Sequence, residues 1–240
     1  VASIQSSDLA AMTTAQINAL NAAQAGALST NQIAALTTSE VRALSTAAAA
    51  GLITEQIVAL SSAQAVALST SQVAALTTTQ IASIETGDLA ALSTAQIASL
   101  GAAQIGALGT AQIAAMTSPE VRAINTSAIS GLTTEQVASL STAQVANLSP
   151  SQIASMSSTQ VSALETSDIG ALSTAQIRAF TTAGVSALTT EQVASLSTAQ
   201  AASLSTAQIA ALTTAQVAAI ETSDLNALST AQVGTLSNTQ

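Results

Sequence analysis

Three pairs of acidic residues are the first candidates for chemistry in this sequence. In each pair a Glu precedes an Asp by three positions, giving Glu85/Asp88, Glu165/Asp168 and Glu221/Asp224. Neighbouring carboxylates can bind calcium or act as a general acid and base. Calcium, however, takes about six to eight oxygen ligands from a flexible loop, and each pair offers few. Because the sequence has no His or Cys and no nucleophile accompanies the pairs, we expect no catalytic residue, no metal and no cofactor.

A second pattern joins the few basic residues to acids. Arg42, Arg122 and Arg178 are each followed thirteen residues later by a glutamate, namely Glu55, Glu135 and Glu191. Two interpretations stay open: solvated surface charges, or ion pairs between coils or between neighbouring molecules that set their register. Charged residues make up only 6% of the chain, which makes a periodic placement informative. We therefore treat these six residues and the six paired acids as candidates for assembly and register.

These charged residues lie within an eight-residue sequence repeat. Residues 204–220 read LSTAQIAALTTAQVAAI, in which the same pattern of eight residues occurs twice. With Ile209 as position one, Leu212 is position four and Gln216 position eight. Positions one and four are apolar throughout, from Val1 and Ile4 onward, and position eight is mostly Gln. The thirty octads run over 1–240 without a break in phase and without an atypical capping unit. We expect one continuous solenoid that is a segment of a longer array.

The composition of the octad favours one short helix per repeat. A single long helix would rotate position four by about 80° per octad, so no stable apolar stripe would form. A β-solenoid would favour β-branched or aromatic residues where this repeat has Ala and Gln. By contrast, Ser or Thr at position five and Gln at position eight form the S/T-x-x-Q capping box, with an apolar residue before the cap. Position five is then the N-cap, position six N1 and position eight N3.

The prolines and charged residues, which are rare in this sequence, fit this assignment of helix positions. The two prolines, Pro119 and Pro150, fall at N2 and N1, where a missing N–H breaks no helical bond. The acids fall at the N-cap, N2 or N3, and the three Arg fall at N5, as a helix macrodipole prefers. We predict an all-α solenoid of about thirty very short helices whose core consists of positions one and four. Helix dimensions favour three to four octads per coil, since two would need a full reversal through almost no loop.

A longer period is superimposed on the octad repeat. IETGDLAAL at 84 returns as LETSDIGAL at 164, and SEVRAL at 39 returns as PEVRAI at 119, in both cases eighty residues later. The next interval is fifty-six residues, from ETSD at 165 to ETSD at 221. The two intervals differ by three whole octads. Length therefore changes in units of the octad, as expected if each octad is a structural module.

The overall charge and hydropathy exclude several classes of protein. The net charge is −9 with only three Arg, so the surface repels nucleic acid. Polar Thr, Ser and Gln interrupt every octad, and no run of about 18 apolar residues predicts a membrane span. The phrase LTTEQVASL at 132–140 resembles the helix opening of TAL-effector repeats and of mesothelin-like superhelical proteins. That likeness covers one octad and lacks the base-reading loop, so we expect no DNA binding.

Arrays of the LTTAQIAAL type are similar, over the whole chain, to octapeptide-repeat arrays in large secreted or surface proteins of Gram-negative bacteria. Those proteins are labelled as haem-utilisation or adhesion related. The resemblance implies an extracellular or cell-surface location. A haem ligand has little support in the residues, which include no His, Cys or Tyr and only three Met.

These observations predict a structural, non-enzymatic protein. We expect a rigid extracellular stalk, or a filament of the cell surface or biofilm matrix that self-assembles from copies of the chain. The alternative is an adhesin-type binding module for a surface, a glycan or, through rows of Thr, ice. Such a module would need a patch that departs from the repeat.

Overall fold

The fold consists of short α-helices joined by extended links. The computed structural model describes residues 5–9 and 11–240. Within these residues it contains twenty-nine helices of four to six residues and no strand. The prediction of one short helix per octad is thereby confirmed.

The helices divide into two compact units, residues 1–131 and 132–240, which are described separately. Each unit has the predicted architecture, and one continuous solenoid over 1–240 stays a prediction. The helices of the first unit are α1 Ser6–Leu9, α2 Thr14–Asn18, α3 Ala22–Gly26, α4 Thr30–Ala35, α5 Thr38–Ala43, α6 Thr46–Ala50, α7 Thr54–Val58, α8 Ser62–Ala67, α9 Thr70–Ala75, α10 Thr78–Ser83, α11 Thr86–Leu89, α12 Thr94–Ala98, α13 Ala102–Ala107, α14 Thr110–Ala115, α15 Ser118–Ala123 and α16 Thr126–Ile129. Those of the second unit are α17 Thr134–Ala138, α18 Thr142–Asn147, α19 Pro150–Ser155, α20 Ser158–Ser162, α21 Thr166–Ala171, α22 Thr174–Ala179, α23 Thr182–Ala187, α24 Thr190–Ala194, α25 Thr198–Ser203, α26 Thr206–Ala211, α27 Thr214–Ala218, α28 Thr222–Ala227 and α29 Thr230–Val233.

Most helices begin at a capping box, and many end where the chain becomes extended. At the start of α26, Ser205 Oγ accepts the Gln208 N–H at 3.2 Å, and Gln208 Oε1 accepts the Ser205 N–H at 2.8 Å. At its end Leu212 has φ −62° and ψ 141°, which cannot continue a helix. Ser205 and Gln208 are therefore N-cap and N3, as predicted. The prolines also lie at N2 of α15 and N1 of α19.

Positions one and four form the core. Ile209 is fully buried and Leu212 is 4% exposed, and the equivalent residues are buried through most of both units. Position one of the late octads departs from this rule, since Leu225 and Val233 are exposed. Val1 and Ile4, which the pattern also assigns to the core, lie outside the described residues.

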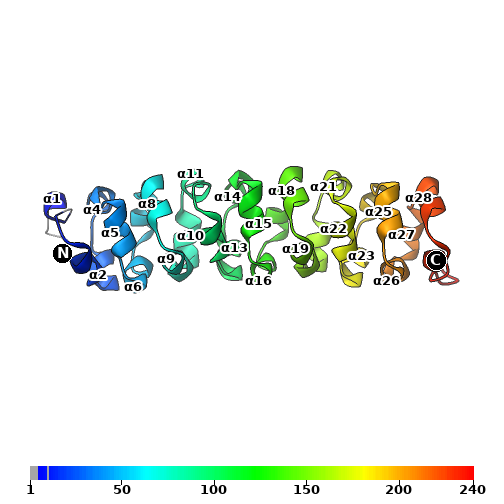
Figure 1. The fold of residues 1–240 in the computed structure, drawn as a ribbon, viewed down its shortest axis with the longest axis horizontal. Helices are drawn as coiled ribbons and strands as arrows, with labels where there is room; N and C mark the ends of the chain where they lie inside the picture. Colours follow the sequence, from blue (N-terminus) through cyan, green and yellow to red (C-terminus); the bar gives the residue numbers. More distant parts are fainter. Residues whose placement is uncertain (1–4, 10) are drawn as a thin grey trace. The chain divides into compact units, whose positions relative to one another are not determined.

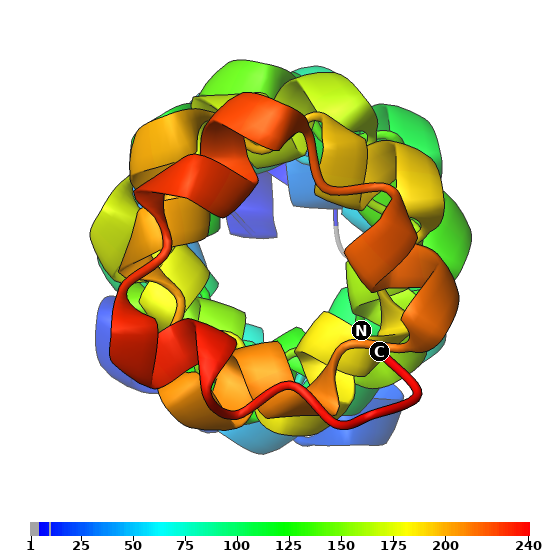
Figure 2. The same ribbon diagram turned by 90° about the vertical axis from the view of Figure 1, so that its right-hand side faces the viewer.

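The helices stack into coils of more than three octads. Each helix packs against the third helix along the chain, as α3 does on α6 in the first unit and α20 on α23 in the second. Figure 2 shows the helices of the second unit, in yellow to red, following one another around a ring. Hydrogen bonds between stacked segments join residues 25 to 31 apart, as from Asn18 to Ala43 and from Gln56 to Ala25. A coil therefore takes between three and four octads, as predicted.

Ten octads make about three coils, which explains why sequence motifs recur after eighty residues. In the first unit α4 and α14, and likewise α6 and α16, lie at matching places around the stack (Figure 1). Gly51 and Gly131 mark one such place. A Cβ on Gly51 would lie 2.5 Å from Ala22 Cα, and a Cβ on Gly131 would clash with Ala102 in the same way. Glycine therefore recurs after eighty residues because the same close approach of two coils recurs.

The cap assignment gives a first prediction. Thr213 Oγ1 accepts the Gln216 N–H at 3.2 Å, whereas Thr214 is an exposed N1 residue. Thr213→Ala should lower stability by about 0.5–2 kcal/mol because the N–H loses its partner, and Thr214→Ala should cost less. Urea unfolding followed by circular dichroism would measure both. The reverse order would contradict the assignment of Thr213 as the N-cap.

Candidate functional site

The most regular polar feature of the structure is the buried glutamine at position eight. In α26 the Gln208 side chain is 2% exposed, and its Nε2 donates to Ile177 O at 3.0 Å and Phe180 O at 2.9 Å in the preceding coil. Its Oε1 accepts the Ser205 N–H in its own helix. One amide thus caps the start of its own helix and the end of an earlier one. The same inter-coil bond, to the carbonyl 28 residues earlier, is made by Gln56, Gln64, Gln72, Gln80, Gln96, Gln104, Gln112, Gln160, Gln176, Gln192, Gln200, Gln216, Gln232 and Gln240.

This arrangement answers a problem created by such short helices. An α-helix leaves four N–H groups at its start and four carbonyls at its end without partners inside the helix. In a helix of four to six residues these ends are almost the whole element. Glutamine supplies an acceptor for one end and a donor for the other. Among the described residues, no buried side-chain nitrogen or oxygen lacks a hydrogen-bond partner.

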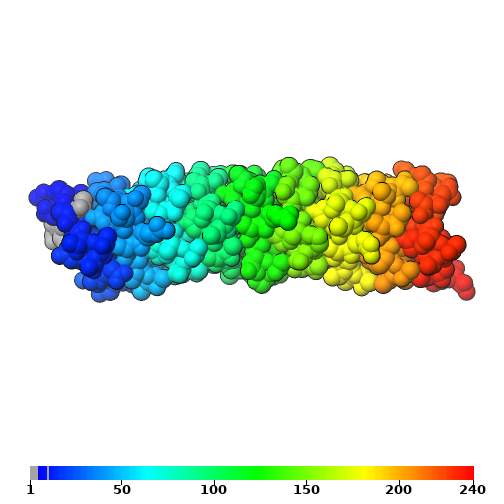
Figure 3. Space-filling model, in the orientation of Figure 1, coloured from blue at the N-terminus to red at the C-terminus, as the bar shows by residue number. Residues whose placement is uncertain are grey.

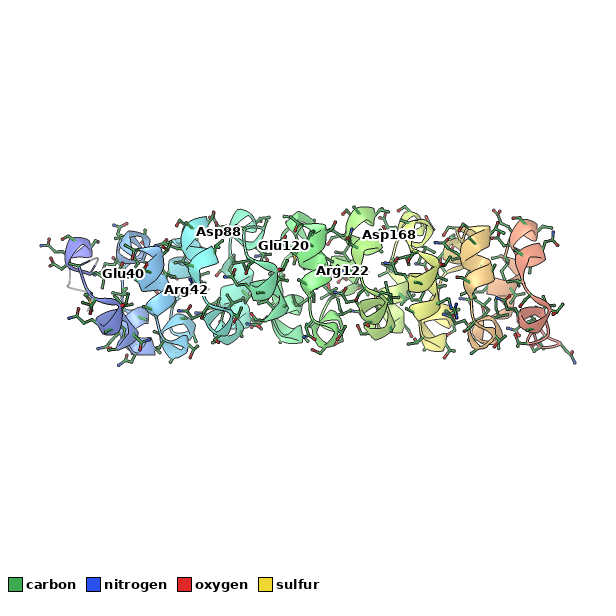
Figure 4. All side chains as sticks on the ribbon, viewed as in Figure 1. Glu40, Arg42, Asp88, Glu120, Arg122 and Asp168 are labelled. Atoms are coloured by element: carbon green, nitrogen blue, oxygen red, sulfur yellow. The ribbon has the colours of Figure 1, made fainter. Side chains whose placement is uncertain are left out.

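Carboxylates replace this glutamine at five buried positions, Glu40, Asp88, Glu120, Asp168 and Asp224. A carboxylate cannot donate, and the bonds of the three aspartates run the opposite way. Asp88 accepts from Ser62 Oγ at 2.5 Å, Asp224 accepts from Thr198 Oγ1 at 2.8 Å, and Asp168 accepts from the Thr142 hydroxyl. Figure 4 labels Glu40, Asp88 and Glu120 in the first unit and Asp168 in the second. The three aspartates join stacked coils, which sequence reasoning missed because their partners lie 26 residues away.

The Glu/Asp pairs therefore do not form a shared site. Glu85, Glu165 and Glu221 are exposed N-cap residues whose side chains make no capping bond, whereas their partners Asp88, Asp168 and Asp224 are buried at N3. The predicted helix positions are confirmed, but the Glu side chains do not cap. In the part of the chain that the structure describes, no three His, Cys, Asp or Glu side chains gather in a way that could hold a metal ion.

The Arg and Glu residues thirteen apart lie on the surface, on helices that do not stack on each other. Arg42 is on α5, which packs against α2 and α8, and Glu55 is on α7, which packs against α4 and α10. Arg178 on α22 and Glu191 on α24 have the same relation in the second unit. A separation of thirteen is about half of the 25 to 31 residues that separate stacked segments. Their role in register stays a prediction.

Two of these glutamates have lowered pKa values. The backbone N–H of Glu135, followed by the Thr133 and Thr134 hydroxyls, lowers the pKa of its carboxyl. Glu191 has the same surroundings, and its pKa is lowered by its own N–H and by Thr189 and Thr190. Both side chains therefore stay ionised in mildly acidic solution.

The described residues enclose little space for a small ligand. An interior cavity of about 10 Å³ lies beside Ala65 and Asp88, and it could hold about one water molecule. A surface groove of about 390 Å³ lies beside Arg178 in the second unit, with Ser203, Ser205 and Ser229 among its lining residues. The visible face of each unit is otherwise filled by side chains (Figure 3).

The glutamine bond gives a second prediction. Gln208→Glu keeps an acceptor for the Ser205 N–H but removes the donor to Ile177 O and Phe180 O. The buried carboxylate should lower stability by about 3 kcal/mol at neutral pH. Gln16→Glu is the matched control, because Gln16 is exposed and accepts the Thr13 N–H at 2.8 Å in the same box; it should change stability by less than about 0.5 kcal/mol. Equal effects in urea unfolding would show that the inter-coil bond contributes nothing.

Asp168 gives a third prediction, for the dependence of stability on pH. Burial raises the pKa of Asp168, partly offset by hydrogen bonds from the Glu165 N–H and the Thr142 hydroxyl. Because the folded pKa exceeds the unfolded one, the ionised group disfavours the folded state at neutral pH, and this cost disappears as the pH falls through the folded pKa. Asp168→Asn should therefore raise the urea midpoint at pH 7 and leave it nearly unchanged below pH 4. A lower midpoint for the variant at pH 7 would contradict the sign.

No helix in the described part of the chain is long and apolar enough to cross a membrane. No curated protein matches the sequence. The family described as the ALTTAQ repeat matches residues 1–38, 81–118, 120–150, 161–198 and 217–240, which is more than half of the chain. Its name reproduces positions three to eight of the octad, the segment that builds the capping box and supplies the inter-coil glutamine. This chain belongs to the ALTTAQ repeat family.

Proposed function

We propose that this protein is a non-enzymatic structural element, a rigid stalk or self-assembling filament of a bacterial cell surface or extracellular matrix. The observation that carries the proposal is the use of position eight. In an enzyme or receptor, polar side chains with free donors line a cavity. Here the recurrent polar side chain is buried between coils, where both ends of its amide are hydrogen-bonded.

The same bond makes each unit stiff along its stacking direction. Every coil is joined to the next by an apolar core and by glutamine amides that carry two or three bonds each. Opening one coil would expose apolar side chains and leave helix ends without partners. A stalk or filament needs this resistance to local opening. The resemblance to arrays of large surface proteins supports the extracellular location.

An adhesin-type binding module is the second candidate, and one observation favours it. Ile53, Val58 and Val66 are 49%, 45% and 43% exposed on α7 and α8. The repeat places Ser or Thr at the first of these positions and usually Ala at the other two. Ile53 is the N-cap of α7 but lacks the side-chain acceptor of a normal N-cap residue. Exposed apolar side chains that depart from the repeat are what recognition of a surface would require.

Electron microscopy of the purified native protein would separate the two candidates. Uniform filaments or long rods would support the structural role. Dispersed particles that attach to a cell or glycan surface, and lose attachment on Ile53→Thr with Val58→Ala and Val66→Ala, would favour the adhesin. Those three changes restore the consensus of the repeat, so they should leave the helical circular dichroism signal unchanged.

A further inference from the structure

The exposed carboxylates are gathered on one side of each unit. In the second unit Glu135, Glu165, Glu191 and Glu221 follow one another at intervals of 30, 26 and 30 residues. These intervals lie within the 25 to 31 residues that separate stacked segments, so each glutamate lies about one coil from the next. Glu55 and Glu85 in the first unit are also 30 apart. We call this set the acidic stripe. Apart from Asp8, it includes every exposed carboxylate among the described residues.

The arginines lie on the opposite side. Arg42 precedes Glu55, and Arg178 precedes Glu191, by thirteen residues, which is about half a coil. In the first unit Arg42 and Arg122 are eighty residues apart, about three coils, so they face the same way. Their helices α5 and α15 occupy matching places in Figure 1, and Figure 4 labels both side chains. Each unit thus has an acidic side and an arginine side.

Neighbouring glutamates of the stripe repel one another within a single copy at low salt. Coils of packed helices rise by about 8–10 Å, close to the Debye length at physiological ionic strength, so salt there screens much of this repulsion. Among the described residues, Arg42 and Arg178 form no ion pair within 4.0 Å that would offset this repulsion. The hydroxyls beside Glu135 and Glu191 also favour their ionised forms. The charges of Arg42 and Arg178 can therefore complement a surface outside the copy that carries them.

We propose that copies of this chain associate side by side, with the arginine side of a unit in one copy against the acidic stripe residues of the same unit in the next. The proposal rests on the structural role proposed above and specifies its geometry. Both sides belong to the same chain and follow the same repeat of coils, so their spacings match. A groove of about 390 Å³ lies beside Arg178 and is lined by Ser203, Ser205 and Ser229. The Ser203 and Ser229 hydroxyls already donate to Gln200 O and Gln232 Oε1, so the Arg178 guanidinium is the group that attracts an incoming carboxylate there.

Two consequences follow from this geometry. The two surfaces that meet are different, so the contact is heterologous and leaves both outer sides free to bind further copies, giving a sheet or bundle rather than a closed dimer. The offset of half a coil between Arg and Glu implies a stagger of about 5 Å between parallel copies. A single exposed ion pair contributes at most about 1 kcal/mol, so the association depends on many pairs acting together.

Cysteine cross-linking tests the arrangement, because the natural sequence contains no Cys. Ala95→Cys places a thiol on the arginine side, on α12, which packs against α15 and lies 27 residues before Arg122. Gly109→Cys places one on the acidic side, at the N-cap of α14, which packs against α11, the helix whose N-cap is Glu85. Gly109 lies fourteen residues after Ala95, so the stagger that brings Arg42 opposite Glu55 also brings these two positions together. Ala63→Cys is the matched control, exposed on α8 one octad after Glu55 and away from the stripe. All three positions are exposed.

The expected result, under oxidising conditions at low ionic strength, is a several-fold excess of dimers between the Ala95 and Gly109 variants over dimers of either variant with itself. The excess should be lost at high salt, and also when Arg42, Arg122 and Arg178 are changed to Gln in the Ala95 variant. Same-site dimers in equal or greater yield, or a mixed yield no higher than with the Ala63 variant, would overturn the arrangement. If filaments still form by electron microscopy in that case, the structural role stands and only this packing is wrong.

Discussion

The structure depends on how eight-residue modules satisfy their own helix ends. A helix of four to six residues cannot persist alone, because most of its backbone groups lack intrahelical partners. The glutamine at position eight resolves this by accepting an N–H from its own N-cap and donating to carbonyls 28 and 31 residues earlier. A shorter or purely accepting side chain can do only one of these two things. The helix ends of an octad therefore find all their hydrogen-bond partners only when the octad is stacked on a neighbouring coil.

This dependence explains where the repeat tolerates change. Surface positions vary among Ala, Ser, Thr and Asn, whereas several buried exceptions at position eight come with a compensating partner or a closer packing of coils. Where Asp replaces Gln, a hydroxyl from the previous coil donates to it, as Ser62 does to Asp88. Where Ala48 and Ala128 replace Gln, Gly51 and Gly131 follow three residues later and allow the backbones to approach. These exceptions recur after eighty residues because about three coils restore the same orientation.

Charge is used in two distinct ways in the molecule. Buried aspartates at N3 join stacked coils, whereas exposed glutamates at the N-cap or N2 form the acidic stripe. A chain with so few charged residues could place them anywhere on its surface. Their segregation onto opposite sides of each unit connects the internal geometry of the coil to the proposed contact between copies. Function in this protein would then lie in the repetition of a surface rather than in a single site.

The sequence by itself determined the structure within each octad, namely where its helix begins and which of its side chains are buried. Capping boxes act over three residues, so Ser205 and Gln208 could be assigned as N-cap and N3, and the apolar periodicity identified Ile209 and Leu212 as core. The tertiary structure decided everything that depends on the turn between successive helices. That angle sets how many octads complete a coil, and hence which residues 25 to 31 apart meet. The second bond of Gln208, the burial of Asp168 and the opposite sides occupied by Arg42 and Glu55 follow from it, because no local signal in the octad specifies the angle.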